Sequence, residues 1–243
     1  MKIGISTIAY ILHKKDLSEL LHIANLNEVE FVFEFGYEDI LNGGYSVSIH
    51  SPSRYVNIAS LSDSHLEYSI NEIKKALSKG FETVVHEGNF TTRFDGWVET
   101  SKKRMEYAMN LLSDYKQNIL IENVPETLFK DINEFFEFFS GFGVNFCLDL
   151  SHYYLKFGNF NKPIPISDKY KGRIKKIHIS DTIEGKDLHL PIGEGNINFK
   201  ELKSFLKEFK EARFIIESVP RNPNSVTGSF IKDLKIFSEV ING

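Results

Sequence analysis

The sequence contains a single cysteine, Cys147, which lies inside the apolar segment 144–150. A disulfide within the chain is therefore excluded, and a buried, unreactive thiol is the expected role of this residue. Because no second thiolate is available, we expect any metal ion to be held by nitrogen and oxygen ligands.

Long apolar runs are also missing. No segment approaches the roughly 18 uninterrupted apolar residues that a membrane span requires, and residues 1–6 form a strand-like alternation without the features of a secretory signal. Hydrophobic residues make up 42% and charged residues 26%, values that are typical of soluble globular proteins. We expect a cytoplasmic protein with no membrane partner, and no protein partner is evident.

The chain has no excess of basic residues. The formal net charge is −4 and the sequence pI is about 6.1, so the protein lacks a global positive field that would attract nucleic acid. A local strip of lysine and arginine beside a cleft still acts within a Debye length of roughly 8–10 Å. Net charge therefore counts only weakly against a DNA substrate.

Hydrophobic periodicity predicts an alternation of strands and helices. Short β-branched or aromatic runs predict eight strands, at 2–6, 28–34, 46–50, 82–86, 118–122, 144–149, 174–180 and 213–217. Apolar residues recur at helical spacing in the segments 17–24, 62–79, 98–115, 127–139, 199–209 and 229–241. Parallel strands need such crossovers, and eight of them close most naturally into a barrel with the helices outside. The expected fold is α/β, a single (β/α)8 TIM barrel over residues 1–243.

Two connections depart from this regular pattern. Residues 34–45 are too few for a full helix, and Gly43-Gly44 is typical of a tight turn, so the crossover between the second and third strands is predicted to be truncated. Between His152 and Arg173, Pro163 and Pro165 interrupt any long helix. This second connection is predicted to be a loop with one short helical piece.

Potential metal ligands end six of the predicted strands, and three more follow closely. In an eight-stranded α/β barrel the carboxyl ends of the strands form the active face. Histidine and carboxylate bind Zn²⁺ or Mn²⁺ when thiolates are absent, and roughly four ligands per ion with bridging carboxylates predicts two or three ions. The nine candidate ligands are His50, His86, Glu122, Asp149, His152, His178, Asp187, His189 and Glu217.

These candidates differ in how specific they are. A single histidine at a strand end, such as His50 or His86, is more often a surface or hydrogen-bonded residue than a ligand. Glu122 and Glu217 each follow three apolar residues, where a buried carboxylate is costly unless a metal or another cation neutralises it. Asp181 is expected either to orient a ligand histidine or to cap a loop.

The segment 187–198 contains the most distinctive motif of the chain, Gly-Glu-Gly-Asn, shortly after Asp187 and His189. Gly193 and Gly195 permit backbone conformations that are closed to other residues. They predict a loop that folds back and directs Asp187 and His189 inward, although the motif alone is also compatible with a plain glycine-rich turn.

At these residues the chain resembles endonuclease IV, the family-2 apurinic/apyrimidinic endonucleases, within the xylose-isomerase-like TIM-barrel superfamily. The motifs that carry the resemblance are Ile-His-Ser-Pro, Val-His-Glu-Gly, Ile-Glu-Asn, Leu-Asp-Leu-Ser-His, His-Ile-Ser-Asp, Gly-Glu-Gly-Asn and Ile-Glu-Ser. The resemblance implies three zinc sites: His50 and His86 with a bridging Glu122; Asp149, His178 and Glu217; and His152, Asp187 and His189.

The implied activity is hydrolysis of DNA at abasic sites, by attack of a metal-bound hydroxide on phosphorus. The segment 55–60, which contains Tyr55 and Asn57, is similar to one that the family uses at the DNA backbone. Arg54, Arg93, Lys156, Lys186 and Arg221 are placed by the prediction in loops on the same rim, where they are candidates for phosphate contacts or ordinary solvated charges. The chain departs from the family pattern after its second strand, where residues 35–45 are too short for the family's DNA-penetrating loop.

A sugar or sugar-phosphate isomerase or epimerase is the alternative, since the superfamily also contains such enzymes. In this interpretation Glu122, Asp149, His178 and Glu217 hold one Mn²⁺ or similar ion, and Glu122 and Glu217 act as the acid/base pair. A single ion leaves His86, His152, Asp187 and His189 without a function, which favours the hydrolase. A barrel that binds a ligand without catalysis is a third hypothesis.

Overall fold

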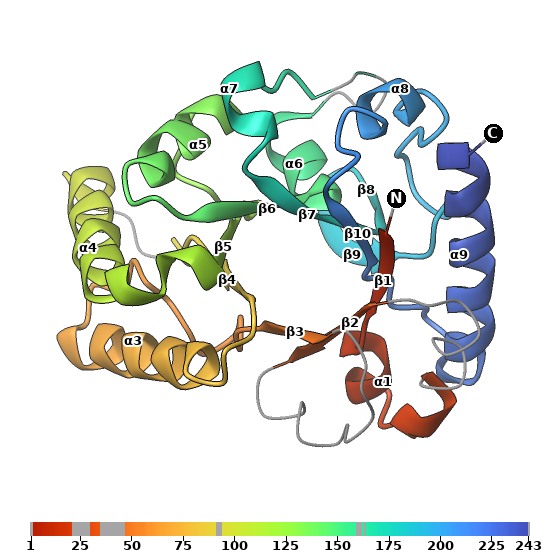
Figure 1. Cartoon of the computed structure of the whole chain (residues 1–243), viewed down its shortest axis with the longest axis horizontal. Coiled ribbons are helices and arrows are strands. Elements are labelled where there is room, and N and C mark those ends of the chain that lie inside the picture. The colour runs from red at the N-terminus through yellow and green to blue at the C-terminus, as the bar shows by residue number, and fades with distance from the viewer. Residues whose placement is uncertain are drawn as a thin grey trace.

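The computed structural model describes residues 2–20, 30–34, 47–90, 94–158, 162 and 164–242. Eight parallel strands form a closed barrel in the order β1-β10-β7-β6-β5-β4-β3-β2, with helices on its outside (Figure 1). The strands are β1 (Lys2–Ser6), β2 (Glu30–Glu34), β3 (Val47–His50), β4 (Thr83–His86), β5 (Ile119–Glu122), β6 (Asn145–Asp149), β7 (Ile174–Ile179) and β10 (Arg213–Ile216). The predicted TIM barrel and its eight strands are confirmed.

The helices agree less closely with the sequence prediction. Those that lie wholly within the described residues are α1 (Ile8–Leu12), α3 (Asp63–Leu77), α4 (Trp97–Leu111), α5 (Ile132–Ser140), α6 (Leu150–Phe157), α7 (Asp168–Lys171), α8 (Lys203–Leu206) and α9 (Val226–Asn242), with 3-10 turns at Ser113–Asn118 and Pro223–Ser225. Residues 17–20 are helical as well. The helix predicted from residue 127 begins five residues later, because the Asp131 carboxylate caps it by accepting the backbone N–H groups of Asn133 and Glu134. The truncated second crossover, predicted over 34–45, lies almost entirely outside the described residues.

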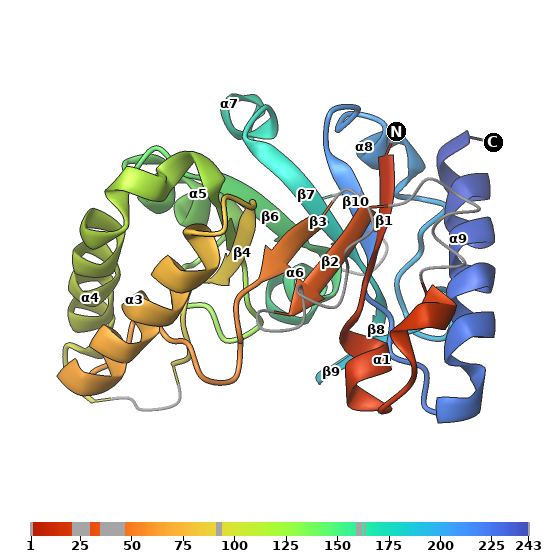
Figure 2. The same cartoon turned by 60° about the horizontal axis from the view of Figure 1, so that its bottom comes forward.

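Two elements near the carboxyl ends of the strands differ from the prediction. The connection that follows β6 contains two short helices, α6 and α7, where one was expected. After β7 the chain forms an antiparallel hairpin, β8 (Asp181–Ile183) and β9 (Lys186–Leu190), which turns at Gly185 with φ 74°. Figure 2 shows that this hairpin, α1 and α6 lie on the side of the barrel toward which the strands run.

Side chains inside the barrel form two layers that matter for the site. Val84, Leu120 and Cys147 form a small buried cluster of their own, separate from the larger core between strands and helices. Two residues further along the same strands come His86, Glu122 and Asp149, which point the same way because strand side chains alternate. The barrel is therefore closed by an apolar layer directly beneath a layer of potential metal ligands.

Cys147 has the role expected from the sequence. It is fully buried, and burial raises the pKa of its thiol to about 12. Such a thiol stays protonated and unreactive at neutral pH.

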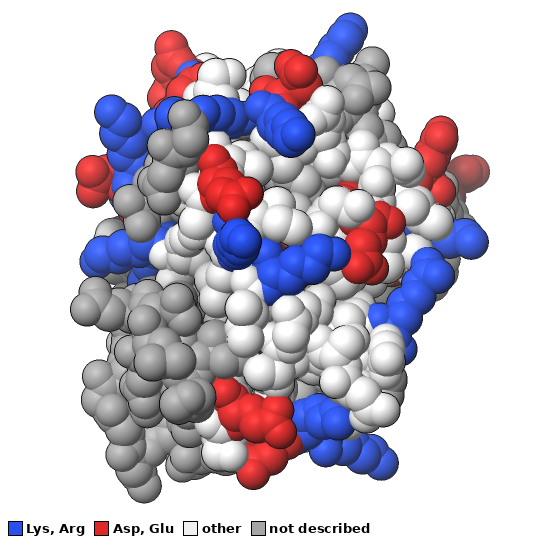
Figure 3. Space-filling view, turned by 90° about the vertical axis from the view of Figure 1, so that its right-hand side faces the viewer, with Lys and Arg blue, Asp and Glu red and all other residues white. Residues whose placement is uncertain are grey.

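Charges of both signs are interspersed on the face that carries α9 (Figure 3). This distribution agrees with the formal net charge of −4, and the described residues of this face form no broad basic surface. Within the described ranges, no helix combines the length and the apolar character that crossing a membrane requires.

Candidate metal centre

All nine predicted ligands lie together at the carboxyl rim of the barrel. The barrel register places His86 beside Glu122 and Asp149 beside His178 on neighbouring strands. The Asp149 carboxylate also caps α6 by accepting the His152 backbone N–H at 2.7 Å, which brings His152 one turn further on into the same space. The hairpin contributes Asp187 and His189, and Glu217 directly follows β10.

The first of three clusters consists of His50, His86 and Glu122. Glu122 Oε2 lies 3.1 Å from His50 Nε2 and 3.5 Å from His86 Nε2. His50 Nδ1 donates to the Ser51 carbonyl at 2.7 Å, so its Nε2 lone pair is directed at the cluster. His86 Nε2 is buried and has no hydrogen-bond partner among the described residues.

The second cluster consists of Glu122, Asp149, His178 and Glu217. His178 Nδ1 lies 3.2 Å from Glu122 Oε1, 3.0 Å from Glu217 Oε2 and 3.9 Å from Asp149 Oδ2. Asp149 Oδ2 is buried without a hydrogen-bond partner in the described part of the chain. The two oxygens of Glu122 thus face different clusters, which is the arrangement of a bridging carboxylate.

The third cluster consists of His152, Asp187 and His189. Each Asp187 oxygen lies 3.3 Å from one histidine, Oδ2 from His152 Nε2 and Oδ1 from His189 Nε2. His152 Nδ1 donates to the Asn123 carbonyl at 2.9 Å, so its Nε2 is the nitrogen that faces Asp187 and the rest of the cluster. His189 adopts φ 45°, an uncommon conformation for a residue other than glycine, and so its side chain is turned by the backbone itself.

The spacing of these atoms fits divalent ions. Atoms bound to one tetrahedral ion at about 2.0–2.2 Å lie roughly 3.3–3.6 Å apart. The separations within the three clusters run from 3.0 to 3.9 Å, and two of the buried atoms, His86 Nε2 and Asp149 Oδ2, lack any other partner among the described residues. A buried polar atom without a partner raises the free energy of the folded protein. A cation bound within each cluster would give these atoms a partner and remove that penalty.

Two carboxylates of the centre, Glu122 and Glu217, have pKa values below their usual range, whereas burial raises the pKa of Asp149. Burial opposes the charge on Glu122, but the neighbouring His178 and His86 outweigh it and hold the pKa well below its usual range. Burial likewise opposes ionisation of Glu217, whose pKa the charge of His178 lowers to about 2. In His152, burial is outweighed by Asp149 and Asp187, so its pKa lies well above the ordinary value. A metal ion bound by His152 would therefore displace a proton from it, whereas burial lowers the pKa of His86 and favours its neutral form.

A cavity of about 260 Å³ opens over the three clusters. Arg54 lines this cavity, with Ile8, Leu12 and Val219 as its apolar walls. The neighbouring Tyr55 is 65% exposed. Of the residues predicted to contact substrate, Arg54 is thus the one that the structure brings to the centre.

Other predicted substrate residues have different surroundings. The Asn57 side chain is occupied internally, since it donates to the Asn89 carbonyl at 3.0 Å and accepts from the Ala59 backbone N–H at 2.9 Å. Lys186 is exposed and next to Asp187 in β9, so strand alternation turns its side chain away from the centre. The prediction that Lys186 lies in a loop is wrong.

The remaining candidate cations are also spread out. Lys156 lies in α6, not in a loop, and both it and Arg221 are exposed. Arg93 lies outside the described residues.

Asp181 caps a loop. Its carboxylate accepts four backbone N–H groups, those of Thr182, Gly193, Gly195 and Ile197, at 2.8–3.0 Å. No hydrogen bond joins it to a histidine among the described residues. Of the two roles expected for Asp181, loop capping describes its contacts.

Asn123 belongs to the candidate site but was not predicted from the sequence. Its side chain donates to the Asp149 carbonyl at 3.0 Å and accepts the Asp149 N–H at 2.9 Å, while its own carbonyl orients His152. Asn123 therefore fixes the positions of two candidate ligands, Asp149 and His152. Its position directly after Glu122 was the available signal, but the partners lie 26 and 29 residues away.

The chain belongs to the xylose isomerase-like TIM barrel family, whose model matches residues 40–234. It is 28% identical over 236 residues to the uncharacterized protein MJ1614 of Methanocaldococcus jannaschii, an alignment that covers 88% of this chain and 91% of that protein. The superfamily resemblance seen in the sequence is confirmed.

Solved structures with the same fold have names from two classes of enzyme. Endonuclease IV from Thermus thermophilus is 21% identical with a TM-score of 0.70, covering 99% of this chain and 98% of that chain. A D-tagatose 3-epimerase-like protein is also 21% identical, with a TM-score of 0.69 and coverage of 98% and 99%. The IOLI protein with a bound zinc atom is 14% identical, with a TM-score of 0.73 and coverage of 99% and 98%. At these identities the likeness shows the fold, and it does not choose between a nuclease and an epimerase.

Proposed function

We propose that this protein is a metal-dependent phosphodiester hydrolase similar to endonuclease IV, with DNA that contains abasic sites as its substrate. The observation that carries the proposal is the third cluster, His152, Asp187 and His189, which lies next to the other two. A single-ion isomerase has no use for these three side chains. A phosphodiester hydrolase uses several ions, because charge must be neutralised on both the attacking and the leaving oxygen.

Each of the three clusters would hold one ion. His50, His86 and Glu122 would hold one ion, Glu122 with Asp149, His178 and Glu217 a second, and the third cluster another. When bound, zinc ions activate water as a nucleophile at neutral pH and withdraw charge from the phosphoryl oxygens. Manganese or another divalent ion suits the same nitrogen and oxygen ligands.

The protein's own residues supply orientation and charge. Glu122 bridges two clusters and Glu217 closes the second, and both remain anionic because their neighbouring histidines lower their pKa values. Arg54 lines the cavity above the clusters, where its guanidinium suits a phosphate oxygen. Ile8, Leu12 and Val219 add apolar surface to the same cavity.

The experiment is metal analysis together with cleavage of an abasic duplex oligonucleotide, for the natural protein and for His189→Ala. We expect two or three equivalents of zinc in the natural protein and one fewer in the variant. Loss of one ion should reduce cleavage by roughly 100-fold or more, since it removes a major source of transition-state charge stabilisation. A protein with at most one ion, or a variant that cleaves normally, contradicts the proposal.

The alternative is a sugar or sugar-phosphate isomerase or epimerase. One specific observation favours it: Glu122, Asp149, His178 and Glu217 form a complete four-residue site without the other ligands. Glu122 and Glu217 would then exchange a proton with the carbon beside a carbonyl. In that case His189→Ala leaves sugar turnover intact, so the same variant separates the two functions.

A further inference from the structure

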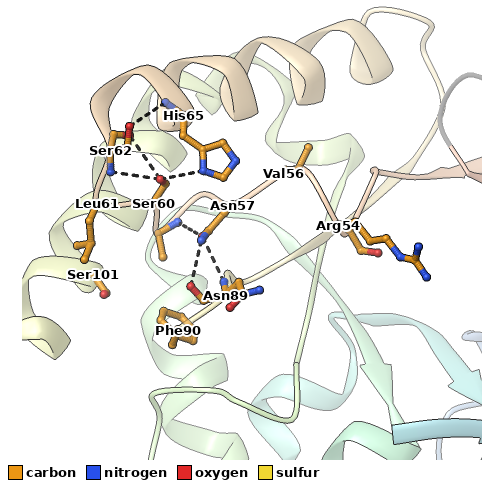
Figure 4. A pocket seen from close by; sticks show the side chains of 12 residues that line it. Arg54, Val56, Asn57, Ser60, Leu61, Ser62, His65, Asn89, Phe90 and Ser101 are labelled. Carbon is orange, nitrogen blue, oxygen red and sulfur yellow. Dashed lines mark hydrogen bonds between the residues drawn. The ribbon is translucent and has the colours of Figure 1, made fainter. Parts of the chain in front are cut away.

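A second cavity, of about 420 Å³, lies beside the metal centre between the start of α3 and the first turns of α4 (Figure 4). We name it the Ser101 pocket, after a residue of its inner wall. It shares Ser53 and Arg54 with the cavity over the metal clusters. A third cavity, of about 110 Å³, shares Ser53 and Asn89 with it and reaches His86 and His152. The Ser101 pocket therefore adjoins the centre.

The wall between these cavities is firmly built. The Asn57 amide joins the loop after β3 to the loop after β4 through its contacts with the backbone of Asn89, at 3.0 and 3.2 Å. Gly88 makes the close approach possible, since a Cβ at this position would lie 2.8 Å from the Ala59 Cβ. These contacts fix the positions of the two loops that line the pocket.

Several polar groups in the pocket are free to bind. Ser101 is only 3% exposed, yet its hydroxyl has no hydrogen bond to any described residue. The side chains of Ser53 and Asn89 also line the pocket without hydrogen bonds in the described part of the chain. Phe90, which is 4% exposed, adds an aromatic surface. Hydroxyl and amide groups beside an aromatic ring suit an uncharged ring that forms hydrogen bonds.

Charge in the pocket is confined to one end. Arg54 is its one lysine or arginine among the described residues, and no described carboxylate lines it. In the view of Figure 4, Arg54 lies at the opposite end of the pocket from Ser101. The same guanidinium lines the cavity over the metal clusters. A substrate with an uncharged group in the pocket would therefore pass Arg54 on its way to the metal centre. The positive charge of Arg54 suits a phosphate at that point.

We infer that the Ser101 pocket binds one nucleoside of the substrate, namely the nucleoside joined to the phosphate that lies at the metal clusters. The inference rests on the proposed phosphodiesterase function and deepens it, because it assigns a place to a neighbour of the reacting phosphate. Ser53, Asn89 and Ser101 supply hydrogen bonds and Phe90 an aromatic contact, while Arg54 spans the connecting phosphate.

The test compares two diesters that release the same chromophore. Methyl p-nitrophenyl phosphate contains no nucleoside, and thymidine p-nitrophenyl phosphate, tested as its 5′ and 3′ isomers, adds one. With the zinc-loaded protein we expect kcat/KM to be roughly tenfold higher for one of the thymidine isomers. Ser101→Leu, which fills the pocket, should abolish this preference by raising KM while kcat changes little.

Two further variants keep the test informative. Ser101→Ala removes only the hydroxyl and should raise KM for the preferred isomer a few-fold, without the bulk that threatens folding. Asn110→Leu, on an exposed position of the same helix, should leave the preference unchanged. Equal rates for all three diesters in the natural protein, or an unaltered preference in Ser101→Leu, would overturn the inference.

Failure of the proposed function can be distinguished from failure of this inference. If the natural protein hydrolyses none of the diesters, the phosphodiesterase proposal fails. Calorimetric titration with thymidine monophosphate then tests the pocket alone. Binding that Ser101→Leu weakens supports the nucleoside site, and absence of binding in the natural protein refutes it.

Discussion

Single residues determine how the three clusters are held together. Glu122 is fully buried, and its two oxygens face separate clusters. Its neighbour Asn123 is 1% exposed and ties the backbone of Asp149 and the ring of His152 to the end of β5. Such supporting contacts set the orientation of metal ligands and usually matter nearly as much as the ligands.

The prediction at this scale concerns Asn123→Ala. Loss of its side-chain contacts should lower zinc affinity by roughly 10–100-fold, because Asp149 and His152 lose their fixed orientation. Competition titration with a chromogenic chelator measures the affinity. Asn133→Ala is a matched control, since the Asn133 amide also makes two backbone hydrogen bonds, to Pro165 and Ser167, away from the centre. Equal zinc affinity in both variants would show that Asn123 has no part in the site.

Individual site residues could be predicted from the sequence where the pattern that marks them lies within a few neighbouring residues. A histidine or carboxylate that ends an apolar strand is visible in the sequence, and all nine predicted ligands meet in the structure. Asn57 illustrates the limit. Its similarity to a DNA-contacting residue suggested a substrate contact, but its amide bonds to the backbone 32 residues away, and no local pattern encodes that partner.

At the scale of elements, the hairpin β8–β9 carries the third cluster, and the loop after it holds the hairpin in place. Gly195 approaches Asp181 so closely that a Cβ would lie 2.3 Å from its Oδ1 and 2.4 Å from the Thr182 carbonyl oxygen. The four N–H groups that Asp181 accepts include that of Gly195 itself. The base of the hairpin has no room for a side chain at this position.

Gly195→Ala should therefore shift the hairpin and loosen Asp187 and His189. We expect a loss of roughly 1–3 kcal/mol in the free energy of unfolding, as for other overpacked sites, together with loss of about one zinc equivalent. Urea denaturation and metal analysis measure the two effects. Gly172→Ala is the control, because a Cβ there meets no atom within 4 Å. Full zinc content in Gly195→Ala would contradict this view of the hairpin.

Helix α9 is joined to the same loop by Asp233. This buried carboxylate accepts the Ser218 hydroxyl at 2.5 Å and the Ile192 N–H at 3.0 Å. Burial raises its pKa from 3.8 to about 6 despite these hydrogen bonds. Between pH 3.8 and about pH 6, Asp233 keeps its proton in the folded protein but loses it in the unfolded chain. The free energy of unfolding therefore falls as the pH rises through this range, and above about pH 6 Asp233 causes no further change.

Asp233→Asn should remove this pH dependence. The free energy of unfolding of the variant minus that of the natural protein should be about 1 kcal/mol larger at pH 7.5 than at pH 5. The size follows from the pKa shift, since one pKa unit corresponds to about 1.36 kcal/mol. Urea denaturation of both proteins at the two pH values gives the difference. A difference that does not change with pH would show that Asp233 is already ionised at pH 5.

Elements were predictable from the sequence where periodicity was strong. All eight barrel strands were predicted, because short apolar runs recur at regular intervals. The β8–β9 hairpin was not predicted, because Lys186–Leu190 contains too few apolar residues to be recognised as a strand. The turn of the hairpin is made by Gly185 and not by Gly193 or Gly195. Helix starts depended on capping side chains such as Asp131, which periodicity alone does not locate.

At the scale of the whole molecule, closure of the barrel brings together side chains that are up to 167 positions apart, from His50 to Glu217. Register aligns the carboxyl ends of neighbouring strands, and the buried layer of Val84, Leu120 and Cys147 beneath them keeps the ligands at the rim. The sequence predicted this convergence through the fold, since a (β/α)8 barrel places all strand ends on one face.

We propose that these nine side chains hold more than one ion at once. Anomalous X-ray diffraction at the zinc edge, on crystals of the zinc-loaded protein, tests it most directly. We expect anomalous peaks at two or three of these places: among His50, His86 and Glu122; among Glu122, Asp149, His178 and Glu217; and among His152, Asp187 and His189. A single peak confined to the four-residue cluster would contradict it.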